Sequence, residues 1–193
     1  MKSMKIFNKL VRPLCLQKAK KITSHCGKYV KGNVLDVGAG RCYIARELKE
    51  KYKIKPTCID VDDLNETDLK LIVYDGKRIP YKNNKFDTVL LVYVLHHCEN
   101  PINVLKECKR VCKKNGKIII FEDFGFIFLT YIMDWIANKM HNVDAPLNFK
   151  SYDEWMKIFE ALNLRLLYCE DSVEKQFFYP FVEHKMYVLR VNK

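Results

Sequence analysis

An acid and two glycines at the end of an apolar run form the stretch of this chain best suited to holding a cofactor. Asp36, Gly38 and Gly40 follow Val34-Leu35, and an amphipathic segment begins directly after them. This pattern predicts a buried strand, a tight turn and a helix, with glycine where the backbone takes a positive φ or lies close to a ligand. The ligand would then lie at the carboxyl end of the strand.

The charge and spacing at this turn favour a cationic cofactor over one that carries phosphate. A dinucleotide-binding turn has a third glycine three residues after the second, and this chain has Tyr43 there. The Asp36 carboxylate would also repel a phosphate at the start of the following helix, where the helix dipole otherwise attracts it. We therefore expect a positively charged group near Asp36.

Four further side chains have the chemistry of a general base, and all are predicted at the carboxyl ends of central strands. They are His96, His97, Glu122 and Asp123. An imidazole titrates near neutral pH, so His97 and His96 are the catalytic residues that the sequence favours. The alternative is that both histidines are structural and pack a loop or cap the helix that follows.

Length and composition predict a single domain. The 193 residues, of which 49% are hydrophobic, suffice for one substantial core. The eight cysteines include no Cys-x-x-Cys pair, so we expect free buried thiols and no metal site. Without a secretory signal, this cysteine usage favours a cytoplasmic location. The longest apolar stretch, residues 117–140, is interrupted by Glu122, Asp123, Asp134 and Lys139 and does not fit a membrane span.

The net charge of +11 is concentrated in the first part of the chain. Residues 1–35 hold nine of the 34 Lys and Arg residues and no acid. Apolar and basic side chains alternate there at helical spacing, and Pro13 should interrupt or bend the helix. We expect a basic amphipathic helical arm at residues 1–31 and a single domain at residues 32–193.

Several roles are open for the arm. We favour a helix that covers the cofactor cleft, but residues 1–21 could instead lie on an anionic membrane surface. The arm could also contact nucleic acid. An acid-free amphipathic start is compatible with a transit peptide as well, although these favour Arg and Ser over Lys. Nothing in the sequence indicates an oligomeric state.

The rest of the chain alternates between apolar strands and amphipathic helices. We expect helices at 44–52 and at 101–113, the second ended by Asn115-Gly116, and strands at 56–60, 69–74, 86–95 and 117–121. This order predicts a parallel sheet covered on both faces. The last two strands, 164–169 and 185–191, should be antiparallel because the loop between them is too short for a crossover helix.

Asp36-x-Gly38-x-Gly40 resembles the first motif of the class I S-adenosylmethionine-dependent methyltransferases, here of the small type 11 kind. Ile59-Asp60-Val61, Asp75-Gly76 with Ile79-Pro80-Tyr81, and Phe86-Asp87-Thr88-Val89 follow in the family's order, so the resemblance covers residues 33–122. It implies a Rossmann-like seven-stranded fold, mostly parallel with an antiparallel last strand and helices on both faces. It also implies S-adenosylmethionine as cofactor and S-adenosylhomocysteine as product. Cys42 stands where the family usually has a third glycine.

The resemblance implies a role for each part of the cofactor site. Asp60, at the end of the second strand, would accept hydrogen bonds from the ribose hydroxyls, and Asp75 would accept one from the adenine amine. Alternatively, Asp60 caps the segment after it and Asp75-Gly76 is an ordinary turn. The implied cofactor-binding residues are Asp36, Gly38, Ala39, Gly40, Asp60, Val61, Asp75, Gly76 and Val92.

We expect a methyltransferase that acts on a small, partly apolar acceptor. An aromatic-rich insertion at about 124–150 would cover the acceptor pocket, unless it is ordinary core packing. The chain lacks the Asn/Asp-Pro-Pro-aromatic motif and the Pro-Cys dipeptide, which disfavours adenine N6, glutamine nitrogen and cytosine C5 as acceptors. One alternative is an RNA or protein methyltransferase that uses the basic arm. Another, suggested by Cys42, is a catalytically silent partner subunit.

Overall fold

The structure, a computed structural model, describes residues 2–125, 148–171 and 182–193. Within them a seven-stranded sheet has the order β3-β2-β1-β4-β5-β7-β6. Neighbouring strands from β3 to β5 are parallel, whereas β7 is antiparallel to both β5 and β6. The predicted sheet is therefore confirmed. The strands are β1 (Val34–Val37), β2 (Pro56–Asp60), β3 (Leu71–Val73), β4 (Phe86–Val92), β5 (Cys112–Gly125), β6 (Leu164–Glu170) and β7 (Val182–Val191).

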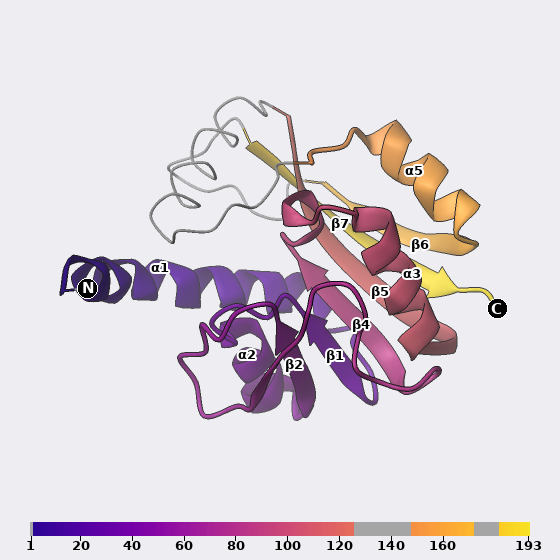
Figure 1. The fold of residues 1–193 in the computed structure, drawn as a ribbon. Helices are drawn as coiled ribbons and strands as arrows, with labels where there is room; N and C mark the ends of the chain where they lie inside the picture. Colours follow the sequence, from indigo (N-terminus) through magenta and orange to yellow (C-terminus); the bar gives the residue numbers. More distant parts are fainter. Residues whose placement is uncertain (1, 126–147, 172–181) are drawn as a thin grey trace.

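Helices cover both faces of this sheet (Figure 1). On one face lie α1 (Lys2–Cys26) and α2 (Tyr43–Tyr52), and on the other α3 (Pro101–Val111) and α5 (Tyr152–Ala161). Successive residues of β5 point to opposite faces, so Ile118 and Ile120 pack with α3 and α5, while Ile119 packs with α1 and α2. Burial on both faces explains the three consecutive isoleucines.

The first helix, α1, runs through Pro13 without a break, so the predicted interruption does not occur. Proline removes one backbone hydrogen bond, but Pro13 is exposed and water can solvate the carbonyl group that loses its partner. Farther along α1, Ile22 and Cys26 are buried in the core with α2. The Tyr52 hydroxyl of α2 donates a hydrogen bond to the Thr23 carbonyl at 2.9 Å. The second half of α1 is thus fixed on the sheet.

The predicted end of the helix before β5 is wrong. Helix α3 ends at Val111 and β5 begins at the next residue, so Asn115-Gly116 lie inside the strand. The β4–β5 register shifts here, because Phe86 pairs with Cys112 but Thr88 pairs with Lys117. Asn115 has φ 62°, and a Cβ on Gly116 would lie 2.6 Å from the Cys112 sulfur. The two residues therefore form a bulge and not a helix cap.

Strand β4 ends earlier than predicted, at Val92. Tyr93 takes a positive φ of 55°, and a short 3-10 helix, η1 (Leu95–His97), follows it. His96 and His97 therefore lie on a turn above the sheet and not on the strand itself.

The helix after the insertion starts as predicted. The Ser151 side chain accepts a hydrogen bond from the Glu154 backbone, and Glu154 accepts one from Ser151 in return, which is a capping box. Residues 126–147, most of the predicted insertion, lie outside the described residues. A search of the described helices finds none with the length and apolarity needed to cross a bilayer.

Candidate active site

A cavity of about 670 Å³ lies at the carboxyl ends of the parallel strands, where sheets of this kind bind ligands. Its volume is in the range of small-molecule sites. Its wall includes part of the predicted site, namely Gly38, Asp60, Val61, Asp75, Gly76 and His97. The sequence did not single out Tyr74, Tyr93, Val94 and Asn100, which also form the wall. Other predicted residues, Asp36, Ala39, Gly40, Val92 and His96, are not part of it.

Two glycines and an acid shape the turn after β1. Gly38 and Gly40 have φ of 70° and 50°, values that disfavour any residue with a side chain. A Cβ on Gly38 would lie 2.4 Å from Val94, whereas one on Gly40 would meet nothing within 4 Å. The Gly40 N–H donates to Asp60 Oδ2 at 2.7 Å, and the Val61 N–H donates to Oδ1 at 2.7 Å. Asp60 therefore joins the turn after β1 to the end of β2 and also faces the cavity.

Asp36 is a buried carboxylate without a cation. Only 2% of the residue is exposed, and its Oδ2 has no hydrogen-bond partner in the described part of the chain. Burial, and then the nearby charge of Asp60, raise the pKa of Asp36 to about 7. A buried, unpartnered carboxylate oxygen is costly, and a positively charged ligand group would compensate for it. The site thus fits an ammonium group and not a phosphate.

Asp75 forms the turn that the alternative interpretation expected. Its Oδ1 accepts hydrogen bonds from the N–H groups of Lys77 and Arg78 at 2.8 and 2.9 Å, and these bonds lower the pKa of Asp75. Gly76 next to it has φ 71° and lies close to Val61. The turn lies in the cavity wall, so a contact with adenine stays a prediction.

Cys42 packs into the protein interior. It has φ 59° at the start of α2, is fully buried, and lies in an apolar cluster with Ala45 and Cys58. Its side chain is not part of the cavity wall. The residue that replaces the family's third glycine therefore fills space between α2 and β2 and does not fill the site.

The two predicted histidines have different surroundings. His96 is buried, its Nδ1 lies 2.6 Å from Glu122 Oε2, and its ring stacks on Phe149. Glu122 also accepts a hydrogen bond from the Leu95 N–H, so this pair fastens η1 to β5. His97 faces the cavity, and burial together with the charge of His96 lowers its pKa to about 4. His97 is therefore neutral at pH 7 and is a weak base.

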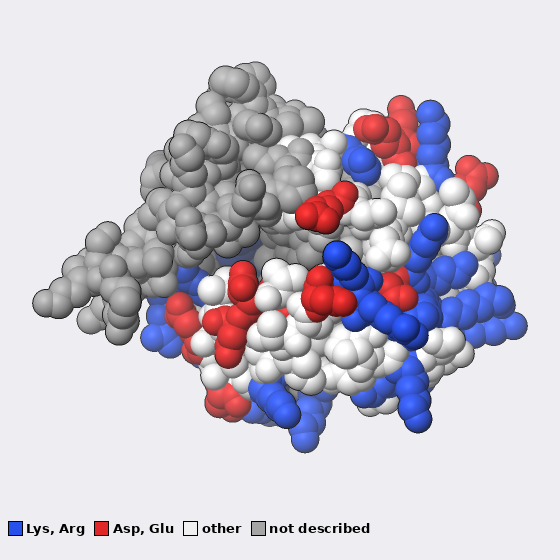
Figure 2. All heavy atoms as spheres, viewed as in Figure 1, with Lys and Arg blue, Asp and Glu red and all other residues white. Residues whose placement is uncertain are grey.

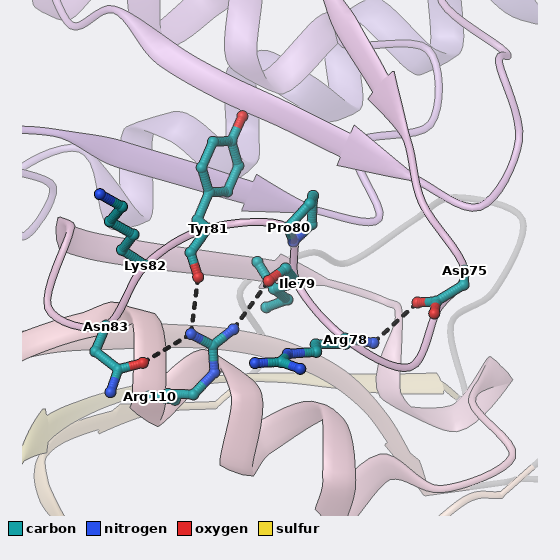
Figure 3. Close-up of a pocket in the computed structure, with 8 residues that line it drawn as sticks. All are labelled: Asp75, Arg78, Ile79, Pro80, Tyr81, Lys82, Asn83 and Arg110. Atoms are coloured by element: carbon teal, nitrogen blue, oxygen red, sulfur yellow. Dashed lines mark hydrogen bonds between the residues drawn. The ribbon is translucent and has the colours of Figure 1, made fainter.

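A second hollow, below the loop at 79–83, is structural (Figure 3). Arg110 donates hydrogen bonds to the carbonyl oxygens of Ile79 and Tyr81 and to Asn83 Oδ1. Its remaining N–H groups bind Glu107. All five donors of the guanidinium are thus used within the protein, which leaves none for a ligand.

Carboxylates outnumber the one lysine, Lys77, in the described cavity wall. Asp60, Asp75 and Glu99 form part of its wall, and Asp62 and Asp63 are exposed on the loop after β2. Figure 2 shows acidic side chains gathered over that loop, with Lys and Arg over α3. This distribution favours a cationic ligand at the carboxyl edge of the sheet.

Comparison with known proteins identifies related methyltransferases. The family described as a methyltransferase domain matches residues 35–120. An uncharacterized protein of Methanocaldococcus jannaschii is 33% identical over 148 residues, 76% of this chain and 71% of that protein. The ubiquinone biosynthesis O-methyltransferase of Rickettsia canadensis is 31% identical over 140 residues, which cover 63% of this chain and 59% of that enzyme.

A solved structure shows the same fold. It is an S-adenosylmethionine-dependent methyltransferase from Methanosarcina mazei, with a TM-score of 0.68 and 14% identity over 87% of this chain and 97% of that one. The chain belongs to the class I S-adenosylmethionine-dependent methyltransferase family.

Proposed function

We propose that this methyltransferase holds S-adenosylmethionine in the cavity at the carboxyl ends of β1, β2 and β4 and methylates a small, partly apolar acceptor. The observation that carries the cofactor site is the buried Asp36, whose Oδ2 has no hydrogen-bond partner in the described structure. The cofactor has an amino group and a sulfonium, and no phosphate. Asp36 lies two residues before Gly38 of the cavity wall, and its negative charge would attract the cationic end of such a molecule.

Asp60 would hold the ribose. Backbone N–H groups of Gly40, Val61 and Asp62 already bind its oxygens, and a carboxylate offers about four lone-pair positions, so one remains for a hydroxyl donor. Its position in the cavity wall next to Val61 and Gly76 supports this role, and the adenine would then lie toward β3.

His97 suits the cofactor better than it suits base catalysis. Bound S-adenosylmethionine supplies a methyl group on a positively charged sulfur, which needs no further activation. A charged imidazole in the same cavity would repel that sulfur, and burial keeps His97 neutral by lowering its pKa. The protein chiefly has to align the acceptor and, where the acceptor carries a proton, provide a base.

Two features support a small acceptor. The cavity of about 670 Å³ is of small-molecule size. One of the relatives is named as an O-methyltransferase of ubiquinone biosynthesis, although this chain spans only 59% of its length. The packing of Cys42 away from the cavity removes the reason for proposing a silent partner subunit.

Transfer of a radioactive methyl group from S-adenosylmethionine tests the acceptor class directly. The wild-type protein is offered a panel of small phenols and quinols, a pool of RNA and a pool of protein, each at low and moderate salt. Label in the organic extract with the small molecules supports the proposal. Label only in RNA or only in protein contradicts it and supports the basic arm as a substrate-binding element. Asp60→Ala is the negative control in every arm.

A further inference from the structure

A second histidine and carboxylate pair lies on the opposite face of the sheet from His96 and Glu122. Asp123 follows Glu122 on β5, so its side chain points to the other face. Asp123 is the direct partner of His184 in the β5–β7 register. The His184 Nδ1 lies 2.5 Å from Asp123 Oδ1, and only 4% of His184 is exposed.

The other nitrogen of His184 has no such partner. Its Nε2 is buried and makes no hydrogen bond to any described residue. A carboxylate at Nδ1 keeps a proton on that nitrogen, so Nε2 is the nitrogen that carries the lone pair whenever the ring has a single proton. Burial raises the pKa of Asp123, but the hydrogen bond from His184 and the charge of Lys18 lower it below its usual range overall, so Asp123 stays ionised. His184 therefore has a fixed orientation and one unused basic nitrogen.

Tyr93 connects this pair to the cofactor cavity. It forms part of the cavity wall, and its ring packs edge-on to the His184 ring with centroids 5.3 Å apart. The Lys18 ammonium of α1 lies 3.9 Å from the centre of the same ring. A base, an aromatic surface and a cation thus meet next to the place where the cofactor would bind.

We propose that His184 is the general base of the methyl transfer, that Asp123 is its positioning residue, and that the acceptor is the hydroxyl group of an aromatic ring. This proposal rests on the proposed methyltransferase function. His184 Nε2 takes the hydroxyl proton, and the oxygen forms a bond to the methyl carbon. The bond from that carbon to sulfur breaks with its electron pair on sulfur, which leaves S-adenosylhomocysteine.

The class of acceptor follows from the groups around Tyr93. A phenolic hydroxyl has a pKa of about 10, within reach of an imidazole base, whereas aliphatic hydroxyls are far weaker acids. Tyr93 adds an aromatic ring beside His184, and the Lys18 charge over that ring favours an oxyanion as it forms. Lys185, next to His184 on β7, pairs with Asp171.

Binding of 4-nitrophenol tests the proposal without turnover, because its phenolate is yellow. The protein is saturated with S-adenosylhomocysteine and titrated with the phenol at pH 6 while absorbance is recorded. We expect the wild type to bind it as phenolate. In His184→Asn the phenolate absorbance should be at least tenfold smaller. His184→Asn keeps an N–H donor toward Asp123. His25→Asn, in a similar pair with Glu170 on the far edge of the sheet, is the matched control and should keep the signal.

Each outcome decides the matter. No phenolate signal in the wild type, or an equal signal in His184→Asn, overturns the role of His184. Failure of the wild type to bind S-adenosylhomocysteine in the same cuvette contradicts the proposed function itself. With S-adenosylmethionine in place of the product, formation of 4-nitroanisole should fall at least a hundredfold in His184→Asn, while the affinity for S-adenosylhomocysteine changes less than twofold.

Discussion

The Asp60 carboxylate accepts a hydrogen bond from the Gly40 N–H, with 2.7 Å between Oδ2 and nitrogen. This contact links residues 20 positions apart and fixes the turn after β1 against the end of β2. Burial raises the pKa of Asp60, and hydrogen bonds from Gly40 and Val61 lower it in part. The residue expected to hold the ribose therefore also shapes the turn that holds the rest of the cofactor.

Asp60→Ala should weaken S-adenosylhomocysteine binding more than tenfold. The variant loses the acceptors for the ribose and leaves the Gly40 N–H without its partner, which should lower the free energy of unfolding by about 1 kcal/mol. Calorimetric titration measures the first effect and urea unfolding the second. The control is Asp63→Ala, which removes an exposed carboxylate of the same loop. Equal affinity in both variants contradicts the role of Asp60.

Asp36→Asn should separate stability from binding. Because the pKa of Asp36 is raised from 3.8 to about 7 in the folded protein, the folded state binds this proton more tightly than the unfolded state. The free energy of unfolding of the protein without ligand should therefore fall as pH rises from about 4 to 7, and the Asp36→Asn substitution should remove this fall.

The same variant should bind S-adenosylhomocysteine more weakly by about 1.5–3 kcal/mol, the usual strength of a hydrogen bond to a charged group. In the wild type, affinity should rise between about pH 5.5 and 7.5 as Asp36 ionises, because this range brackets its raised pKa of about 7. Urea unfolding and calorimetry over this pH range measure both quantities. A variant that is less stable than the wild type at pH 8, or that keeps full affinity, would show that Asp36 has another role.

Two glycine substitutions should differ in how much they destabilise the protein. Gly38→Ala meets Val94 at 2.4 Å in a backbone with φ 70°, so it should destabilise the protein by about 3 kcal/mol. A Cβ on Gly40 meets nothing, so Gly40→Ala should cost only the strain of its positive φ, about 1 kcal/mol. It should nevertheless weaken cofactor binding tenfold or more, because we propose that the cofactor extends from the cavity wall at Gly38 into the open space beside Gly40. Thermal unfolding measures the stability of the two variants, and calorimetry measures their affinity for the cofactor.

Cys42→Gly should leave cofactor affinity unchanged. Glycine relieves the left-handed backbone at φ 59°, worth about 1 kcal/mol, but empties the space that the side chain fills beside Ala45 and Cys58. The two effects nearly cancel in the free energy of unfolding. A gain of affinity above threefold for S-adenosylhomocysteine would mean that Cys42 does crowd the turn.

The fold and the turn between β1 and α2 could be predicted because their signals are local. Asp36, Gly38 and Gly40 lie within five residues, and Asp60 ends the next apolar strand. The bulge at Asn115-Gly116 was missed because these residues suit a helix cap equally well, and only the pairing of β5 with β4 decides between the two.

The proposed acceptor site, formed by His184, Asp123 and Tyr93, could not be predicted from the sequence. His184 lies 61 residues from Asp123, and only the antiparallel pairing of β5 and β7 brings them together. Tyr93 reaches the cavity because its backbone takes a positive φ, which the sequence of a tyrosine after a β-strand does not indicate. The four candidate bases of the sequence included Asp123 but not the histidine that it contacts.

Thermal unfolding with S-adenosylhomocysteine tests the central claim most directly, with NADH as the competing phosphate-bearing cofactor. At a hundred times its dissociation constant a ligand adds about 2.7 kcal/mol to the free energy of unfolding. We expect this stabilisation with S-adenosylhomocysteine, its loss in Asp60→Ala, and none with NADH. Stabilisation by NADH alone, or equal stabilisation of the wild type and Asp60→Ala by S-adenosylhomocysteine, would contradict the proposed cofactor site.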